Sequence, residues 1–270
     1  MEENITPSLE KALAGSEADA ANSLKAAQGV SLALKKYARV LKEGNLKEIQ
    51  SVMNDVEKAE LVLRQQIATA KEGWNFDIEA YFNSGNFVKE ILSTAEQKGV
   101  RLFERDDRLY SYPVLVRVMA SERSVLIDKA KDKRIRPTVL VNRLKELQKK
   151  PPRFRPEAFL EALHEAYRLA LRIKGSGEKN ASDKGEVIAL ADVYELFTLL
   201  PGQSREYSRQ EFARDIYLLD RSGTGETKDG IRLSLPASTG TKISSRTFSV
   251  INEYGEEKRY YGIAFTTKEQ

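Results

Sequence analysis

A dense run of basic residues between positions 129 and 155 carries the clearest chemistry in this sequence. It holds eleven Lys or Arg side chains against two carboxylates, a formal charge of +9, whereas the whole chain carries +4 and the remainder therefore −5. Local positive charge of this kind is typical of a surface that binds a polyanion, above all the phosphate backbone of DNA or RNA. The candidate nucleic-acid-binding residues are Lys129, Lys131, Lys133, Arg134, Arg136, Arg143, Lys145, Lys149, Lys150, Arg153 and Arg155.

Two other interpretations of this basic run stay open. It could dock on an acidic protein surface, or it could be a solvated helix face without a function of its own. The imbalance of signs favours a binding surface, because solvated faces usually mix both charges. The run contains no set of side chains suited to reading base edges, so we expect contact with the phosphate backbone without sequence specificity.

No motif in the chain identifies a reaction. The single histidine, His164, lies one position away from an apolar helical stripe and is expected at a boundary or on the surface rather than at a catalytic or metal site. Asp106 and Asp107 are adjacent carboxylates that are better explained by a solvated turn. The segment 223–230 lacks the Gly-Lys-Ser/Thr ending of a phosphate loop and precedes a strand. We therefore expect a non-enzymatic protein with no catalytic residue, no cofactor and no metal site.

The composition is typical of a folded, helix-rich protein. A hydrophobic content of 41% argues against a disordered chain, and the sequence has no apolar run of about 18 residues that could span a membrane. The absence of cysteine excludes disulfides, thiolate zinc sites and cysteine nucleophiles. The first residues do not have the pattern of a secretory signal, so we expect a cytoplasmic protein.

Two long helical patterns predict an N-terminal arm over residues 1–73. Apolar residues recur at spacings of three and four, which is typical of a coiled-coil-like seam. Gly44 is expected to end the first helix and Asn45 to cap the second, so that the two fold back as an antiparallel helical hairpin. The predicted seam residues are Leu24, Ala27, Leu34, Ala38 and Leu41, and then Leu46, Ile49, Met53, Val56, Leu63, Ile67, Ala70 and Trp74.

The rest of the chain predicts two further modules. Residues 74–174 contain short helices, alternating strands, a basic helix that starts at Pro137 and a strong amphipathic helix, the order of a winged-helix-like module. The strands are predicted as two pairs separated by Pro113, at 100–105 and 108–112 and at 114–119 and 124–128.

Residues 175–185 are small, polar and glycine-rich and are predicted to be a linker. Residues 186–270 contain two helices followed by three strands, which indicates a second winged-helix-like module. Ser208 and Glu211 form a capping-box pattern that predicts the start of the second of these helices.

These patterns together predict an α+β fold, predominantly helical, in which an antiparallel hairpin precedes two winged-helix-like modules. The expected function is a non-enzymatic nucleic-acid-binding or nucleic-acid-associated subunit of a larger assembly. The alternative is a protein-interaction adaptor of an ATPase or of a chromosome-organising or defence complex. The expected partners are a DNA or RNA backbone and, through residues 7–73, a partner protein or a second copy of the chain, with no membrane contact.

Overall fold

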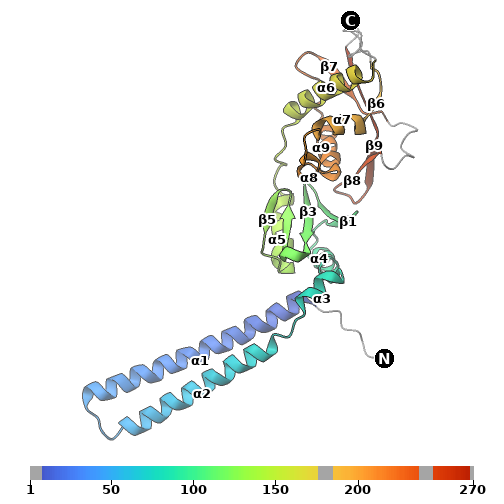
Figure 1. Ribbon diagram of the computed structural model, residues 1–270. Helices are drawn as coiled ribbons and strands as arrows, with labels where there is room; N and C mark the ends of the chain where they lie inside the picture. Colours follow the sequence, from blue (N-terminus) through green and yellow to red (C-terminus); the bar gives the residue numbers. More distant parts are fainter. Residues whose placement is uncertain (1–7, 176–184, 237–245, 268–270) are drawn as a thin grey trace, which may run out of the picture. The chain divides into compact units, whose positions relative to one another are not determined.

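The computed structural model describes residues 8–175, 185–236 and 246–267, which form an α+β protein (Figure 1). The chain divides into two compact units that interleave along the sequence. Unit 1 consists of Met1–Val100, Val118–Val125 and Lys131–Leu144, and unit 2 consists of Arg101–Arg117, Leu126–Ala130 and Lys145–Gln270. The domain boundary predicted at residues 175–185 stays a prediction, because residues 176–184 lie outside the described part of the chain.

The predicted helical hairpin is present in unit 1 and consists of α1 (Leu9–Glu43) and α2 (Ile49–Gly73) (Figure 1). Gly44 ends α1 in the left-handed conformation, at φ 69°, and its N–H donates to the Leu41 carbonyl, as expected of a C-terminal glycine. The predicted cap of the second helix was wrong. Asn45 accepts a turn hydrogen bond from the Glu48 N–H through its backbone carbonyl (3.1 Å), and α2 begins only at Ile49.

The two helices of the hairpin meet through a seam that mixes small side chains with larger apolar ones. Buried and half-buried positions alternate at spacings of three and four along each helix. Of the residues predicted to lie in this seam, Ile49, Val56, Leu63 and Ala70 do so. Seven large apolar residues of the same prediction are exposed instead: Leu24, Leu34, Leu41, Leu46, Met53, Ile67 and Trp74. The seam consists of Ala12, Ser16, Asp19, Ser23, Ala26, Val30, Ala33, Tyr37 and Val40 on α1 and of Ile49, Val52, Val56, Ala59, Leu63, Gln66 and Ala70 on α2.

Two short helices, α3 (Ile78–Asn83) and α4 (Asn86–Gln97), follow the hairpin in unit 1, and Glu90 on α4 fixes the start of α1. The Glu90 carboxylate accepts hydrogen bonds from Ser8 Oγ (2.7 Å), the Leu9 N–H (2.8 Å) and the Glu10 N–H (3.0 Å), and another from the Tyr81 hydroxyl. Burial raises the pKa of Tyr81, and its hydrogen bond to Glu90 raises this pKa further. A carboxylate in this position satisfies the first N–H groups of a helix and interacts favourably with its dipole.

A five-stranded sheet follows α4, with the strands side by side in chain order. The strand pairs predicted before and after Pro113 are confirmed, whereas the last strand lies in the basic run and was not predicted. Helix α5 (Pro137–Gln148) starts at the predicted proline. The strands are β1 (Phe103–Arg105), β2 (Arg108–Ser111), β3 (Val114–Met119), β4 (Ser124–Ile127) and β5 (Ala130–Asp132), with the turn η1 (Ala120–Glu122) between β3 and β4.

The C-terminal part of unit 2 combines helices with two small antiparallel sheets. The strand order in the larger sheet is β6-β10-β7, and β8 pairs with β9 in a separate ribbon. The predicted capping box of α9 is confirmed, with Ser208 and Glu211 bonded in both directions. The helices are α6 (Pro156–Ile173), α7 (Leu190–Phe197), α8 (Gln203–Glu206) and α9 (Arg209–Ser222), and the strands are β6 (Ile188–Ala189), β7 (Ile231–Ser234), β8 (Phe248–Ile251), β9 (Glu257–Tyr260) and β10 (Gly262–Thr267).

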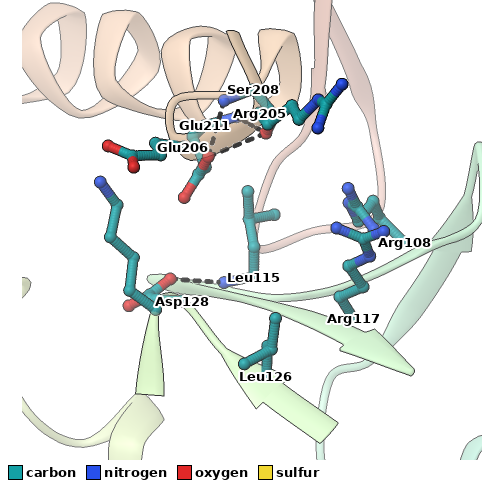
Figure 2. A pocket seen from close by; sticks show the side chains of 10 residues that line it. Arg108, Leu115, Arg117, Leu126, Asp128, Arg205, Glu206, Ser208 and Glu211 are labelled. Carbon is teal, nitrogen blue, oxygen red and sulfur yellow. Dashed lines mark hydrogen bonds between the residues drawn. The ribbon is translucent and has the colours of Figure 1, made fainter. Parts of the chain in front are cut away.

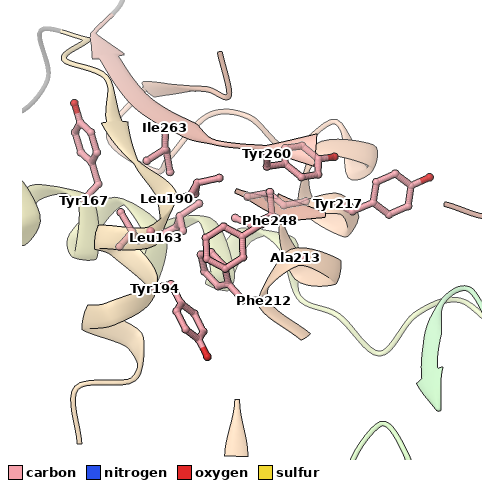
Figure 3. Close-up of a cluster of buried hydrophobic side chains, with 14 of the residues drawn as sticks. Leu163, Tyr167, Leu190, Tyr194, Phe212, Ala213, Tyr217, Phe248, Tyr260 and Ile263 are labelled. Carbon is pink, nitrogen blue, oxygen red and sulfur yellow. The ribbon is translucent and has the colours of Figure 1, made fainter. Parts of the chain in front are cut away.

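An aromatic cluster fills the core of unit 2 and joins α6, α7 and α9 to the strands (Figure 3). The ring of Phe212 lies 4.9 Å from that of Phe248 and 5.3 Å from that of Tyr194. The prediction of a boundary or surface histidine was wrong, because His164 on α6 is only 2% exposed. Its ring lies 4.6 Å from that of Phe265, since β10 covers this side of the helix.

Candidate functional site

The basic run extends over β5, α5 and the segment that leads into α6. Within the described part of the chain, five of its eleven cations form ion pairs. Three of the carboxylates involved lie outside the run, so its formal charge of +9 overstates the charge that a ligand would meet. The pairs are Lys131 with Glu122, Arg134 and Arg143 with Asp132, Arg136 with Glu10 and Glu17, and Lys149 with Glu146.

Buried Asp132 at the end of β5 holds two of these arginines. Its carboxylate accepts from Arg134 Nε at 3.0 Å and pairs with Arg143 Nη1 at 2.9 Å. A buried carboxylate needs such partners, because an unpaired charge away from water is costly. Arg134 and Arg143 therefore have a structural role in connecting β5 to α5.

Glu10 and Glu17 bind Arg136 and thereby connect α5 to α1. Arg136 Nε lies 2.7 Å from Glu10 Oε1, and Arg136 Nη1 lies 2.7 Å from Glu17 Oε2. The Thr138 N–H also donates to Glu10 (3.0 Å). Burial alone would raise the pKa of Glu10, but the hydrogen bonds from Thr138 and Arg136 outweigh it and lower this pKa.

The remaining cations of the basic run lie on the surface. Lys145 is exposed on α5. Five further exposed cations make no ion pair with any described residue, so they are the part of the run best suited to bind a polyanion. These five are Lys129, Lys133, Lys150, Arg153 and Arg155.

A second group of cations surrounds a cavity of about 270 Å³ within unit 2 (Figure 2). Lys129 comes from the basic run, whereas the three arginines at this cavity were not predicted as site residues. In Figure 2 the guanidinium groups of the three arginines lie on one side of the cavity, opposite Asp128 and Glu206. The lining consists of Arg108, Arg117, Lys129, Arg205, Leu115, Leu126, Asp128, Glu206, Ser208 and Glu211.

Arg108 and Arg117 are neighbours on adjacent strands. The antiparallel register of β2 and β3 pairs Leu109 with Val116, and the next position in this register sets Arg108 opposite Arg117. Burial lowers the pKa of half-buried Arg108, and the nearby Arg117 guanidinium lowers it further, while Glu211 offsets part of this effect. Directly opposed like charges destabilise a sheet, so this pair costs folding free energy.

The carboxylates that line the cavity form hydrogen bonds or ion pairs with other groups of the protein, with the exception of exposed Glu206. Asp128 accepts from the Leu115 N–H (3.0 Å) and pairs with Arg214. Glu211 accepts from the N–H (2.7 Å) and the hydroxyl (2.9 Å) of Ser208 in the capping box of α9. By contrast, none of the four cationic side chains at the cavity makes an ion pair or a hydrogen bond with another residue in the described ranges. The cavity therefore presents positive charge that the protein itself does not neutralise.

Helix α9 begins beside this cavity but exposes little of itself. Arg214 and Asp215 form an ion pair (2.9 Å), and the Tyr207 hydroxyl donates to Asp215 (2.8 Å). Burial raises the pKa of Asp215, and Arg214 and Tyr207 offset only part of that rise. Six of the fourteen residues of α9 are buried, and its fully exposed residues are confined to its last turn. The six buried residues are Phe212, Ala213, Ile216, Tyr217, Leu218 and Leu219.

Sequence reasoning could have found the arginine pair from the turn between the two strands. A tight turn at Tyr112-Pro113 pairs Ser111 with Val114, and counting back along both strands sets position 108 opposite 117. The contribution of Arg205 from α8, about ninety residues further along the chain, carries no such signal.

Comparisons with known proteins returned no matching family model, no similar curated protein and no similar solved structure. Among the residues that the structure describes, no helix is both long and apolar enough to cross a membrane. The same described ranges contain no group of three or more His, Cys, Asp or Glu side chains arranged to hold a metal ion.

Proposed function

We propose that this chain is a non-enzymatic interaction subunit whose helical arm pairs with the arm of a second copy. The observation that supports this proposal is an apolar face, interrupted at Glu60, along one side of the α1–α2 hairpin. Leu46 and Ile67 on this face are 79% and 54% exposed. The face consists of Ala27, Leu34 and Leu41 on α1, of Met53 and Ile67 on α2, and of Leu46 and Trp74, which flank α2.

The ion pair between Lys36 and Asp55 (3.3 Å) identifies the two sides of the hairpin. Each of these residues precedes a seam residue, Tyr37 on α1 and Val56 on α2, so both lie on one polar side. Tyr37 and Val56 belong to one of two alternating sets of seam positions, and Ala33, Val40 and Val52 belong to the other set. In an antiparallel pair of helices, the residues that follow this other set lie together on the opposite side. Five residues of the apolar face follow seam residues in this way, Leu46 and Trp74 continue the same seven-residue spacing beyond the ends of α2, and Glu60 is the charged interruption among them.

Covering this face would stabilise the hairpin, because it would remove further apolar surface from water. Seven of its sixteen seam residues are Ala or Ser and two more are polar, which limits the apolar surface that the two helices bury in each other. From Leu46 to Trp74 the face runs for about 40 Å at 1.5 Å per residue. Contiguous apolar patches of this extent usually mark interaction sites. Two such hairpins can close into a four-helix bundle that buries the same face of both copies.

Sedimentation velocity of the full-length chain tests this proposal. We expect the wild type to be a dimer and the double variant Leu34→Glu/Ile67→Glu to be a monomer. The matched control is Leu32→Glu/Leu61→Glu, which changes two equally exposed leucines outside the face and should leave the dimer intact. A monomeric wild type, or equal effects of both double variants, would contradict pairing through this face.

Binding of a nucleic-acid backbone is the second candidate function, supported by the five exposed cations without ion pairs. The strand order β6-β10-β7 with α6, α7 and α9 is that of a winged helix, which supports this interpretation of the C-terminal module. The central module has no comparable support, since its strands follow one another in a five-stranded meander. Because α9 is buried in unit 2, contact would fall to the basic segment rather than to that helix.

Fluorescence anisotropy with a labelled duplex tests this second candidate. Reversing Lys133, Arg153 and Arg155 to Glu should abolish binding at low salt, and the wild-type affinity should fall with a log–log slope of about −0.9 per phosphate contacted. The charge-matched control reverses three exposed lysines of the arm, Lys25, Lys47 and Lys58. Equal losses in both triple variants, or no binding by the wild type, would exclude a specific role of the basic segment.

A further inference from the structure

We propose that the cavity beside Arg108 and Arg117 is a binding site for the phosphate group of a small phosphorylated ligand. This inference does not depend on the helical arm, because every residue that lines the cavity belongs to unit 2.

The first argument is the cost of the arginine ladder across β1, β2 and β3. Arg105 pairs with Arg108 in the β1–β2 register, and Arg117 follows on β3. Arg105 is neutralised by Glu257 at 3.1 Å, but neither Arg108 nor Arg117 has a carboxylate partner among the described residues. Opposed like charges weaken a sheet, and an anion bound between them would remove this repulsion.

The second argument is that two of the three carboxylates at the cavity have partners in the protein, whereas the cationic side chains there have none among the described residues. Asp128 and Glu211 already have hydrogen-bond partners within the protein. Unpaired cations around a partly enclosed space attract an anion, because charges interact more strongly there than in open water. Half-buried Arg108 has lost part of its hydration without gaining an ion-pair partner among the described residues, and Glu211 offsets only part of this loss.

The third argument concerns the class of ligand. A guanidinium binds phosphate through two parallel N–H donors, and two guanidinium groups side by side suit a dianion better than a single carboxylate. Arg205 and Lys129 can supply additional donors. A space of about 270 Å³ is too small for a duplex and lies at the lower end of small-molecule sites. Leu115 and Leu126 add apolar lining, so a small organic body attached to the phosphate can fit as well.

Thermal unfolding and calorimetric titration of the full-length protein test this site. The probes are inorganic phosphate, a nucleoside monophosphate, and a short single-stranded oligonucleotide with and without a 5′-phosphate. Phosphate itself should raise the melting temperature. Stronger binding of the monophosphate would indicate a small metabolite, whereas stronger binding of the 5′-phosphorylated strand would indicate a nucleic-acid end.

Arg117→Gln is the decisive variant. It should melt at the same or a higher temperature than the wild type without ligand, since it removes a like-charge contact. It should bind every phosphate probe about 10- to 100-fold more weakly, the effect of losing a hydrogen bond to a charged group. Arg172→Gln, an exposed cation of unit 2 outside both the cavity and the basic run, is the control and should keep full affinity. Equal weakening by Arg117→Gln and Arg172→Gln, or no stabilisation of the wild type by any phosphate probe, would overturn the proposal.

Discussion

Removing the Glu90 carboxylate is expected to loosen the root of the helical arm. Four donors meet at this carboxylate, three of them from the first residues of α1 and one from Tyr81. A hydrogen bond to a charged acceptor contributes about 1.5–3 kcal/mol, but the donors at the helix start can return to water. We therefore expect Glu90→Ala to lower the free energy of unfolding by about 3 kcal/mol, and Glu90→Gln by about 1 kcal/mol because one oxygen still accepts.

Trp74, the single tryptophan of the chain, allows a local measurement of this loss. Its ring lies 6.1 Å from that of Phe76, which lies 4.9 Å from that of Tyr81. In urea unfolding followed by Trp74 fluorescence, a loss of 3 kcal/mol corresponds to a midpoint shift of about 1.5 M for a slope near 2 kcal/mol/M.

Glu96→Ala is the matched control for this measurement, because it removes an exposed carboxylate from the same helix. It should leave the Trp74-monitored midpoint unchanged. If Glu90→Ala moved the midpoint no further than Glu96→Ala, the account of Glu90 as the anchor of α1 would be refuted.

Three further predictions concern single contacts. Hydrogen bonds from Thr138 and Arg136 hold the pKa of Glu10 below its ordinary value of 4.5. The stability that they contribute is therefore complete above pH 4.5 and is lost as the pH falls through the lower pKa of the folded state. Urea midpoints, followed by Trp74 fluorescence, that stay level from pH 6 to 3 would contradict this. Gly255→Ala should lower the free energy of unfolding by about 2 kcal/mol or more, because φ is +86° and a Cβ would lie 2.6 Å from the Phe103 ring. A melting temperature equal to that of the wild type would disprove this clash. Asp132→Asn should destabilise the protein by about 2–3 kcal/mol in the same assay, because it leaves two arginines without a counter-charge; an unchanged melting temperature would show that the buried pairs contribute nothing.

The sequence predicted that the hairpin forms but not which side of each helix is inside. Gly44 and the heptad spacing indicated two antiparallel helices, and both features are present. The predicted seam residues Ile49, Val56, Leu63 and Ala70 on α2 do lie inside, whereas large apolar residues such as Leu34 and Leu41 were wrongly assigned to the interior. Alanine and serine suit a close helix contact as well as a solvated face, so only the structure distinguishes the two.

The sequence gives the formal charge of the basic run, but the ion pairs that its cations form with distant carboxylates could not be predicted from it. Glu10 lies 126 residues before Arg136, and no local pattern indicates that they meet. The buried position of His164 was equally hidden, since β10, which covers it, is contributed by residues about a hundred positions further on. Local features such as the Ser208–Glu211 capping box were predicted correctly, because they depend on neighbouring residues alone.

Thiol protection on the arm tests the pairing of two copies most directly. The chain has no cysteine, so Met53→Cys and Leu61→Cys each introduce a single reactive thiol, the first on the apolar face and the second outside it. If a second copy covers the face, maleimide should modify Cys at position 53 more slowly as the protein concentration rises, while modification at position 61 stays constant. Modification rates that are independent of protein concentration at both positions would contradict the account.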